Sequence, residues 1–190
     1  MYHISQDKRA QQSSEWLVSA LIRLMGTKSL GEITVTDLVQ EAKVGRTTFY
    51  RCFDTIEDVL RYQCDLEFSE CARYLKKSIF SNFKAQHKAP FLLPFMQYWY
   101  LNFSTIELLV NAKREDIIKQ AFFKMIETLR AEFPHVEIQH YNYFIEIRAA
   151  IAIALLTEWV RTNRSMSPEA LVSAFERQLL MDHDIFDLLR

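Results

Sequence analysis

Glycine and proline are scarce in this chain, with three glycines and four prolines among 190 residues. An all-β architecture needs a turn every ~8–12 residues, and turns rely heavily on these two residue types. Apolar residues recur instead at helical spacing, and no segment shows convincing alternation with a period of two. The sequence therefore predicts an all-α fold of about nine helices, without an internal repeat.

The composition excludes a disordered chain and argues against a membrane protein. Hydrophobic residues make up 49% of the chain and the formal net charge is −1, whereas disordered chains have less apolar content and more net charge. The longest apolar run covers residues 149–156, and a membrane-spanning helix needs ~20 such residues. The N-terminal residues lack the apolar segment of a secretion signal, and three cysteines cannot all pair within one chain. We expect a cytoplasmic protein.

The first helix is expected over residues 8–26. Its apolar residues lie at helical spacing and predict one buried stripe: Trp16, Leu17, Ala20, Leu21, Leu24 and Met25. Gly26 is expected to end the helix, because glycine adopts the left-handed backbone conformation at little cost.

Residues 34–53 have the pattern of two short helices joined by a tight turn. Thr34 can cap the first of them, with Asp37 three residues later as in a capping box. The turn is expected over 43–45, and the second helix over 46–53. In a helix-turn-helix module the second helix enters the DNA major groove.

The expected outer side of this second helix is basic and rich in hydroxyl groups. The window 43–51 contains no acidic residue and offers Lys43, Arg46, Thr47, Thr48, Tyr50 and Arg51. Such groups reach phosphate oxygens and base edges. Residues 1–65, however, hold eight Lys and Arg against nine Asp and Glu. DNA affinity would therefore depend on this local patch and on dimerisation, and amphipathic helix pairs of this kind also occur in proteins that never bind DNA.

The stretch ITVTDLVQEAKVGRTTFYRCFDTIEDVL, residues 33–60, resembles the DNA-binding signature of the TetR family of bacterial transcriptional regulators. The motif resemblance covers residues 8–65, and the rest of the chain matches only by its helical pattern. The resemblance implies a helix-turn-helix DNA-binding domain over 1–54. It also implies a helical regulatory and dimerisation domain over 55–190, entered through a long connecting helix.

The resemblance further implies a homodimeric repressor that binds a palindromic operator in double-stranded DNA and is released by a small-molecule effector. The basic window and the resemblance together predict these DNA contacts: Thr34, Thr36, Lys43, Arg46, Thr47, Thr48, Tyr50 and Arg51. Three positions depart from the family pattern, namely Gly45, Cys52 and Ile56, where a serine cap, a polar residue and a lysine are usual. Cys52 and Ile56 favour the alternative function, a helical protein-interaction adaptor or co-regulator that has lost autonomous DNA binding.

The C-terminal residues suggest a ligand pocket and a dimer interface. A small apolar or aromatic effector is expected in a pocket lined by Phe95, Tyr98, Trp99, Phe103, Phe122, Tyr143 and Ile147, although aromatic residues at helical spacing are most often core. The run 149–156 is apolar all round and alternates small alanines with larger residues. Part of it is expected to be buried only in a dimer, through an interface of Ile151, Leu155, Trp159, Leu171, Phe175 and Leu179.

Catalytic and metal-binding motifs are missing from the sequence. The five histidines form no zinc-protease or Cys/His zinc pattern, and there is neither a glycine-rich phosphate loop nor a nucleophile elbow. Cys64 and Cys71 lie on one helical stripe and are interpreted as buried apolar residues. We expect neither an enzyme nor a bound cofactor or metal.

Overall fold

A computed structural model describes residues 1–4, 7–82, 91–132 and 139–180. Its described part contains nine α-helices, which confirms the all-α prediction, and a 3-10 turn over Leu30–Glu32. The helices are α1 (Lys8–Met25), α2 (Val35–Glu41), α3 (Arg46–Cys52), α4 (Ile56–Asn82), α5 (Leu92–Leu101), α6 (Ser104–Asn111), α7 (Glu115–Ala131), α8 (Tyr141–Arg161) and α9 (Pro168–Leu180).

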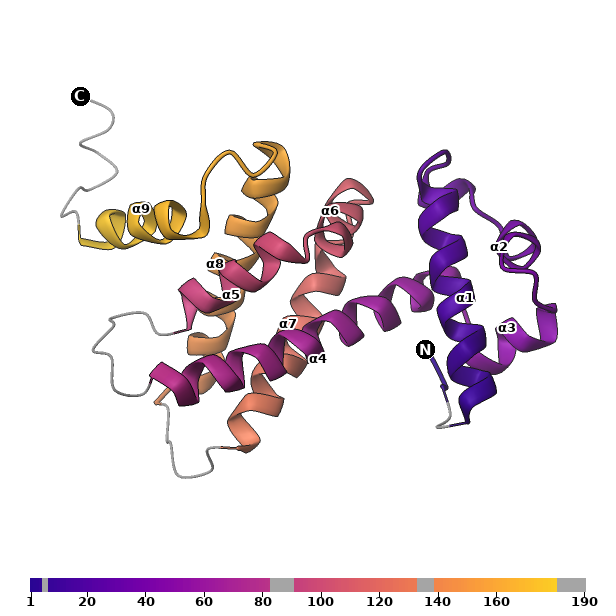
Figure 1. The fold of residues 1–190 in the computed structure, drawn as a ribbon, viewed down its shortest axis with the longest axis horizontal. Helices are drawn as coiled ribbons and strands as arrows, with labels where there is room; N and C mark the ends of the chain where they lie inside the picture. The colour runs from indigo at the N-terminus through magenta and orange to yellow at the C-terminus, as the bar shows by residue number, and fades with distance from the viewer. Residues whose placement is uncertain (5–6, 83–90, 133–138, 181–190) are drawn as a thin grey trace.

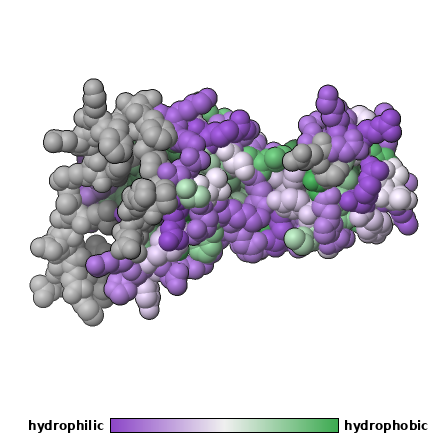
Figure 2. Space-filling model, turned by 90° about the horizontal axis from the view of Figure 1, so that it is seen from below, coloured by the Kyte–Doolittle hydropathy of each residue, from purple (hydrophilic) through white to green (hydrophobic). Residues whose placement is uncertain are grey.

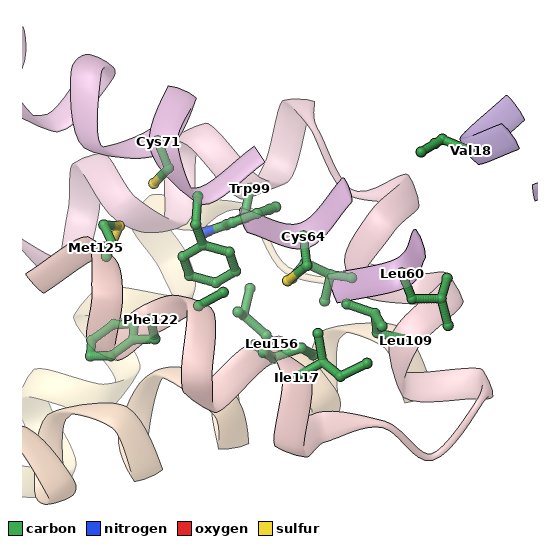
Figure 3. Packing of buried hydrophobic residues seen from close by; sticks show 14 of the residues in the cluster. Val18, Leu60, Cys64, Cys71, Trp99, Leu109, Ile117, Phe122, Met125 and Leu156 are labelled. Carbon is green, nitrogen blue, oxygen red and sulfur yellow. The ribbon is translucent and has the colours of Figure 1, made fainter. Parts of the chain in front are cut away.

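The long helix α4 joins two groups of helices. Figure 1 shows α1, α2 and α3 at one end of the molecule, α5 to α9 at the other, and α4 running between them. The α4 stripe predicted from the sequence is buried, and it includes Cys64, Phe68, Cys71 and Leu75. Figure 3 shows Cys64 and Cys71 pointing into this core, beside Trp99 and Met125. Burial raises the pKa of both thiols, so both cysteines are structural apolar residues.

One expectation for α1 was wrong, and a second, that Gly26 ends the helix, is confirmed but for a different reason. Trp16 is 50% exposed, and the buried face is formed instead by residues such as Ser14, Leu17, Val18 and Leu21. The buried stripe of α1 therefore runs through positions 10, 14, 17 and 21 and leaves Trp16 outside. These positions also have helical spacing, so the sequence pattern is compatible with this stripe as well. Gly26 does follow the helix, but its backbone is right-handed, with φ −68°. The helix end thus needs no special glycine conformation.

The sequence predicts side-chain caps at Thr34, at Ser104 and at Ser167 before Pro168. The structure confirms the first and the third. Thr34 accepts a hydrogen bond from the Asp37 amide at 3.1 Å, and Ser167 accepts one from the Ala170 amide at 3.2 Å. A capping box from Ser104 to Glu107 was also expected. Ser104 is instead already helical, and Phe103 occupies the cap position without a side-chain hydrogen bond.

Helix α8 is not buried all round within one chain. Its inner face includes Ala149, Ala152, Leu156 and Trp159, which pack toward α6 and α7. Its outer face exposes Tyr143, Ile147, Ala150 and Ala154. Part of the run 149–156 is therefore exposed in the single chain, as expected for a surface that only a dimer would bury. The burial of that part in a dimer stays a prediction.

The surface is mostly hydrophilic, with small apolar areas, in the view of Figure 2. None of the helices in the described ranges is both long and apolar enough to pass through a lipid bilayer.

Candidate nucleic-acid interface

Helix α3 is fixed to the N-terminal group by its aromatic face. Phe49 and Phe53 are completely buried, and their ring centroids lie 6.1 Å apart. Cys52 is completely buried beside them. Burying a large aromatic side chain is worth ~1.5–3 kcal/mol. The orientation of α3 is therefore determined by these three side chains, which leave its other face outward.

The outward face of α3 carries the polar residues predicted to contact DNA. Arg46, Thr47, Tyr50 and Arg51 are all exposed, and their spacing of one, three and one residues places them on one side of a helix. Tyr50 is 57% exposed, and its ring makes an edge contact with Phe49. Thr48 is half-buried. The structure thus brings four of the predicted side chains together on one solvent-facing surface.

The turn before α3 is held by backbone hydrogen bonds. The amide of Val44 donates to the Val39 carbonyl at 3.0 Å, and that of Lys43 donates to the Gln40 carbonyl at 3.1 Å. Lys43 has φ 54°, so the left-handed residue of this turn is a lysine rather than the neighbouring glycine. Gly45 has φ −79° and caps α3 without a side chain. The Lys43 side chain remains exposed.

Two predicted contact residues lie on α2 or at its start and already have partners in the chain. Thr34 donates its hydroxyl to the Asp37 carboxylate at 2.8 Å and its amide to the same oxygen at 2.9 Å. These bonds, the amide first, lower the pKa of Asp37 below its ordinary value. Thr36 accepts a hydrogen bond from Nη2 of Arg46 at 2.5 Å. The Arg46 guanidinium is therefore steadied by α2, with several of its donors still available.

The acidic residues nearby do not neutralise α3. Glu41 pairs with Arg23 at 2.6 Å, and Asp37 lies 3.3 Å from Lys28. Glu57, at the start of α4, pairs with Arg114. Within the described ranges no carboxylate forms an ion pair with the three cations of this surface: Lys43, Arg46 and Arg51. Within those ranges, Arg46 and Arg51 thus lie unpaired on the outward face of α3, and Lys43 lies unpaired in the turn before it, although residues 1–65 carry almost no net charge. Local sequence patterns do not indicate that the nearby acidic residues pair with other cations.

The three departures from the family pattern have different structural consequences. Cys52 is completely buried, so it cannot touch a ligand outside the protein. Ile56 is half-buried and packs against the core at the start of α4. A side chain added at Gly45 would meet no atom within 4 Å. None of the three changes the outward polar face of α3.

The residues predicted to line an effector pocket do not gather around one space. Phe95, Trp99, Phe103 and Phe122 are buried, as is Tyr98, and several pack ring against ring. Tyr143 and Ile147, by contrast, are 74% and 57% exposed on the outer face of α8. The helical period places these two residues on the surface because α7 and α6 cover the other side of α8.

The residues predicted for a dimer interface differ in their burial within the single chain. Ile151, Leu155, Leu171 and Phe175 are half-buried. Trp159 is 2% exposed and contacts Phe103 and Tyr100, so it belongs to the interior of the chain. The side chain of Leu179 lies outside the described residues.

Comparison with known proteins supports the fold. No protein-family model and no curated protein matches the chain. The structure of Lin0861 from Listeria innocua superposes with a TM-score of 0.75 at 19% identity, over 94% of this chain and 96% of that one. A TetR transcriptional regulator from Streptococcus agalactiae superposes with a TM-score of 0.58 at 19% identity, over 90% and 94% of the two chains. The chain therefore has a TetR-like fold, as the resemblance of residues 33–60 predicted.

Proposed function

We propose that this protein is a sequence-specific, DNA-binding transcriptional regulator that acts in the cytoplasm. The observation that carries the proposal is the outward face of α3, where exposed arginines, hydroxyl groups and a tyrosine form no ion pair with any carboxylate that the structure describes. Arg46 and Thr47 would read base edges, with Arg51 beside them, because arginine chelates the O6/N7 edge of guanine and a threonine methyl contacts the thymine methyl. Thr34, Thr36, Lys43, Thr48 and Tyr50 would hold phosphates.

The DNA-binding domain would span residues 1–54, and residues 55–190 would form the regulatory and dimerisation domain. The exposed apolar stripe of α8, with Ile151 and Leu155 at its edge, would meet the same stripe of a second copy. Two-fold symmetry would then repeat the recognition helix one DNA turn away, at ~34–36 Å, and require a palindromic operator.

The proposed regulatory ligand is a small apolar or aromatic effector that releases a repressor from its operator. The indole N–H groups of Trp99 and Trp159 are buried and find no acceptor among the described residues. An unsatisfied buried donor costs ~1–3 kcal/mol. An effector with an acceptor oxygen near these aromatic residues would remove that cost. A screen by thermal shift tests this, because a ligand of the native state raises its apparent stability.

The experiment that tests DNA binding is selection from random double-stranded DNA with the purified chain. We expect an inverted repeat, and a binding constant for it that falls with salt on a log–log plot. An adaptor that has lost DNA binding would select no sequence and bind duplex at no salt concentration. That result would overturn the proposal in favour of protein interaction.

A further inference from the structure

A small pocket lies where the N-terminal helix group meets the C-terminal helices. Its volume is about 60 Å³, and its walls are mostly aliphatic. The lining comes from α1 (Val18, Leu21, Ile22), α4 (Val59, Leu60, Gln63) and α6 (Ser104, Thr105, Leu108, Leu109). In Figure 3, Leu60 and Leu109 lie side by side, and Val18 lies apart from them on α1. All three line the pocket. The pocket shares no residue with the proposed DNA contacts or with the aromatic cluster.

Thr105 gives this pocket a polar group without a partner. The residue is 6% exposed, and its hydroxyl forms no hydrogen bond with any residue that the structure describes. Thr128 and Thr162, by contrast, donate to the carbonyl four residues earlier, at 2.9 and 2.8 Å. The buried polar atoms that lack a partner in the described ranges are the indole nitrogens of Trp99 and Trp159. The Thr105 hydroxyl is not among them, so it is accessible from the pocket. A molecule with an oxygen can hydrogen-bond to this hydroxyl in place of water.

We propose that this junction pocket binds a small, largely apolar molecule with one hydroxyl or carbonyl oxygen, such as a short-chain alcohol or ketone. A cavity needs ~10–15 Å³ to hold one water molecule, which has one non-hydrogen atom. The 60 Å³ of this pocket therefore accommodates about four to six non-hydrogen atoms. The carbon chain lies against the aliphatic walls, and the oxygen hydrogen-bonds to Thr105. The size of the pocket excludes large ligands. Its uncharged, mostly aliphatic lining excludes charged ligands, because their burial without a counter-charge is unfavourable.

Occupancy of this pocket acts on two parts of the molecule at once. Helix α1 packs against α2 and α3, whereas α6 packs against α7 and α8. A molecule that touches both α1 and α6 shifts their relative position toward whichever arrangement it binds more tightly. This regulatory consequence depends on the proposed function, whereas the binding itself does not.

The test is a titration of the full chain with 1-butanol, followed by NMR of labelled Leu and Val methyl groups. We expect saturable shifts for the methyls of Val18, Leu21 and Leu108, and none for the remote Val172. Thr105→Val keeps the shape and removes the hydroxyl, so 1-butanol should bind about five- to tenfold more weakly. Xenon, which needs no hydrogen bond, should bind both proteins equally. Thr128→Val, at an exposed position of α7, is the matched control and should change the binding of neither 1-butanol nor xenon.

Filling the pocket provides a second, independent variant. Leu108→Phe should abolish saturable binding, and Ile22→Phe, from a position 44% exposed, does the same if the first variant folds poorly. Shifts that rise linearly without saturation, or that persist in both filled variants, would overturn the proposal. The titration contains no DNA. A chain that binds 1-butanol but no operator would contradict only the proposed function, and a chain with the opposite behaviour would contradict only this site.

Discussion

Helices α3 and α8 each bury one face and present the other to solvent, but their exposed faces are chemically opposite. The outer face of α3 holds Arg46, Thr47, Tyr50 and Arg51. The outer face of α8 holds a stripe of Tyr143, Ile147, Ala150 and Ala154. Cations without carboxylate partners suit a polyanion, whereas an apolar stripe suits another apolar surface. Each exposed face therefore indicates the chemistry of its own proposed partner.

The largest expected effect is on the anchoring of α3. Phe49→Ala removes a completely buried ring and should lower the free energy of unfolding by about 3–5 kcal/mol, as measured by urea denaturation. Tyr50→Ala, one position along and mostly exposed, is the control and should change stability by less than about 1 kcal/mol. Equal losses from the two substitutions would mean that the buried and outer faces of α3 have been misassigned.

The next largest effect is expected from a charge placed in the exposed stripe of α8, which should weaken dimerisation. Ile147→Glu places a charge in the proposed interface and should weaken dimerisation about 100-fold, or ~3 kcal/mol, while the monomer stays folded. Analytical ultracentrifugation of the wild-type chain and the Ile147→Glu variant, over a series of concentrations, measures the dimer dissociation constant. Asn142→Glu, exposed on the same helix but outside the stripe, should leave the dimer intact. An unchanged dimer in the Ile147 variant would remove α8 from the interface.

DNA recognition should separate the base-reading and phosphate-holding residues of α3. Arg46→Ala should cost about 1–3 kcal/mol at the selected operator and loosen base preference. Tyr50→Ala should instead weaken binding to all sequences alike. Competition binding, with the operator and with a duplex of scrambled sequence, measures the affinity of each variant for both DNAs and so distinguishes the two effects. If Arg46→Ala leaves both affinity and preference intact, the assigned role of Arg46 is wrong.

The cap of α2 should respond to acid. The hydrogen bonds from Thr34 lower the pKa of Asp37 in the folded chain, so the charged carboxylate stabilises the fold above the unfolded-state pKa. That contribution is lost as the pH falls through the lower, folded-state pKa. NMR titration of the Asp37 carboxyl should show a pKa below ~3.9, and Thr34→Val should raise it. A pKa unchanged by Thr34→Val would exclude this capping bond in solution.

The smallest effect is expected from the uncapped start of α3. Gly45 has a φ that any residue adopts and open space around it, so Gly45→Ser should add a cap and stabilise the chain by a few tenths of a kcal/mol, roughly. The melting temperature measures this, with Gly31→Ser in the 3-10 turn as a control. A lowered melting temperature would show that the cap position is not Gly45.

Features that depend on neighbours in sequence were predictable. The Thr34–Asp37 and Ser167 caps form between residues three apart. The Ser104 cap failed because the helix begins one residue earlier, with Phe103 at the cap, and a single residue decides a capping box. The faces of α3 were also predictable, because Phe49 and Phe53 leave the basic residues outside.

The C-terminal site was much less predictable. Trp159, Tyr143 and Ile147 are all apolar residues of one helix, yet the first is interior and the other two are exposed. The period of the pattern relates the three positions to one another, but it does not say which side the other helices cover. The pocket between α1, α4 and α6 likewise draws its walls from three distant segments, none of which carries a motif.

The sequence by itself determined the helical class, the approximate extent of the first three helices and the polar outer face of α3, because these follow from the spacing of residues within a few turns. Only the tertiary structure decided which apolar stripe enters the single-chain core, which carboxylates pair away from α3, and where the two helix groups enclose a pocket. Those outcomes depend on contacts between segments far apart in the chain, and local periodicity carries no information about such contacts.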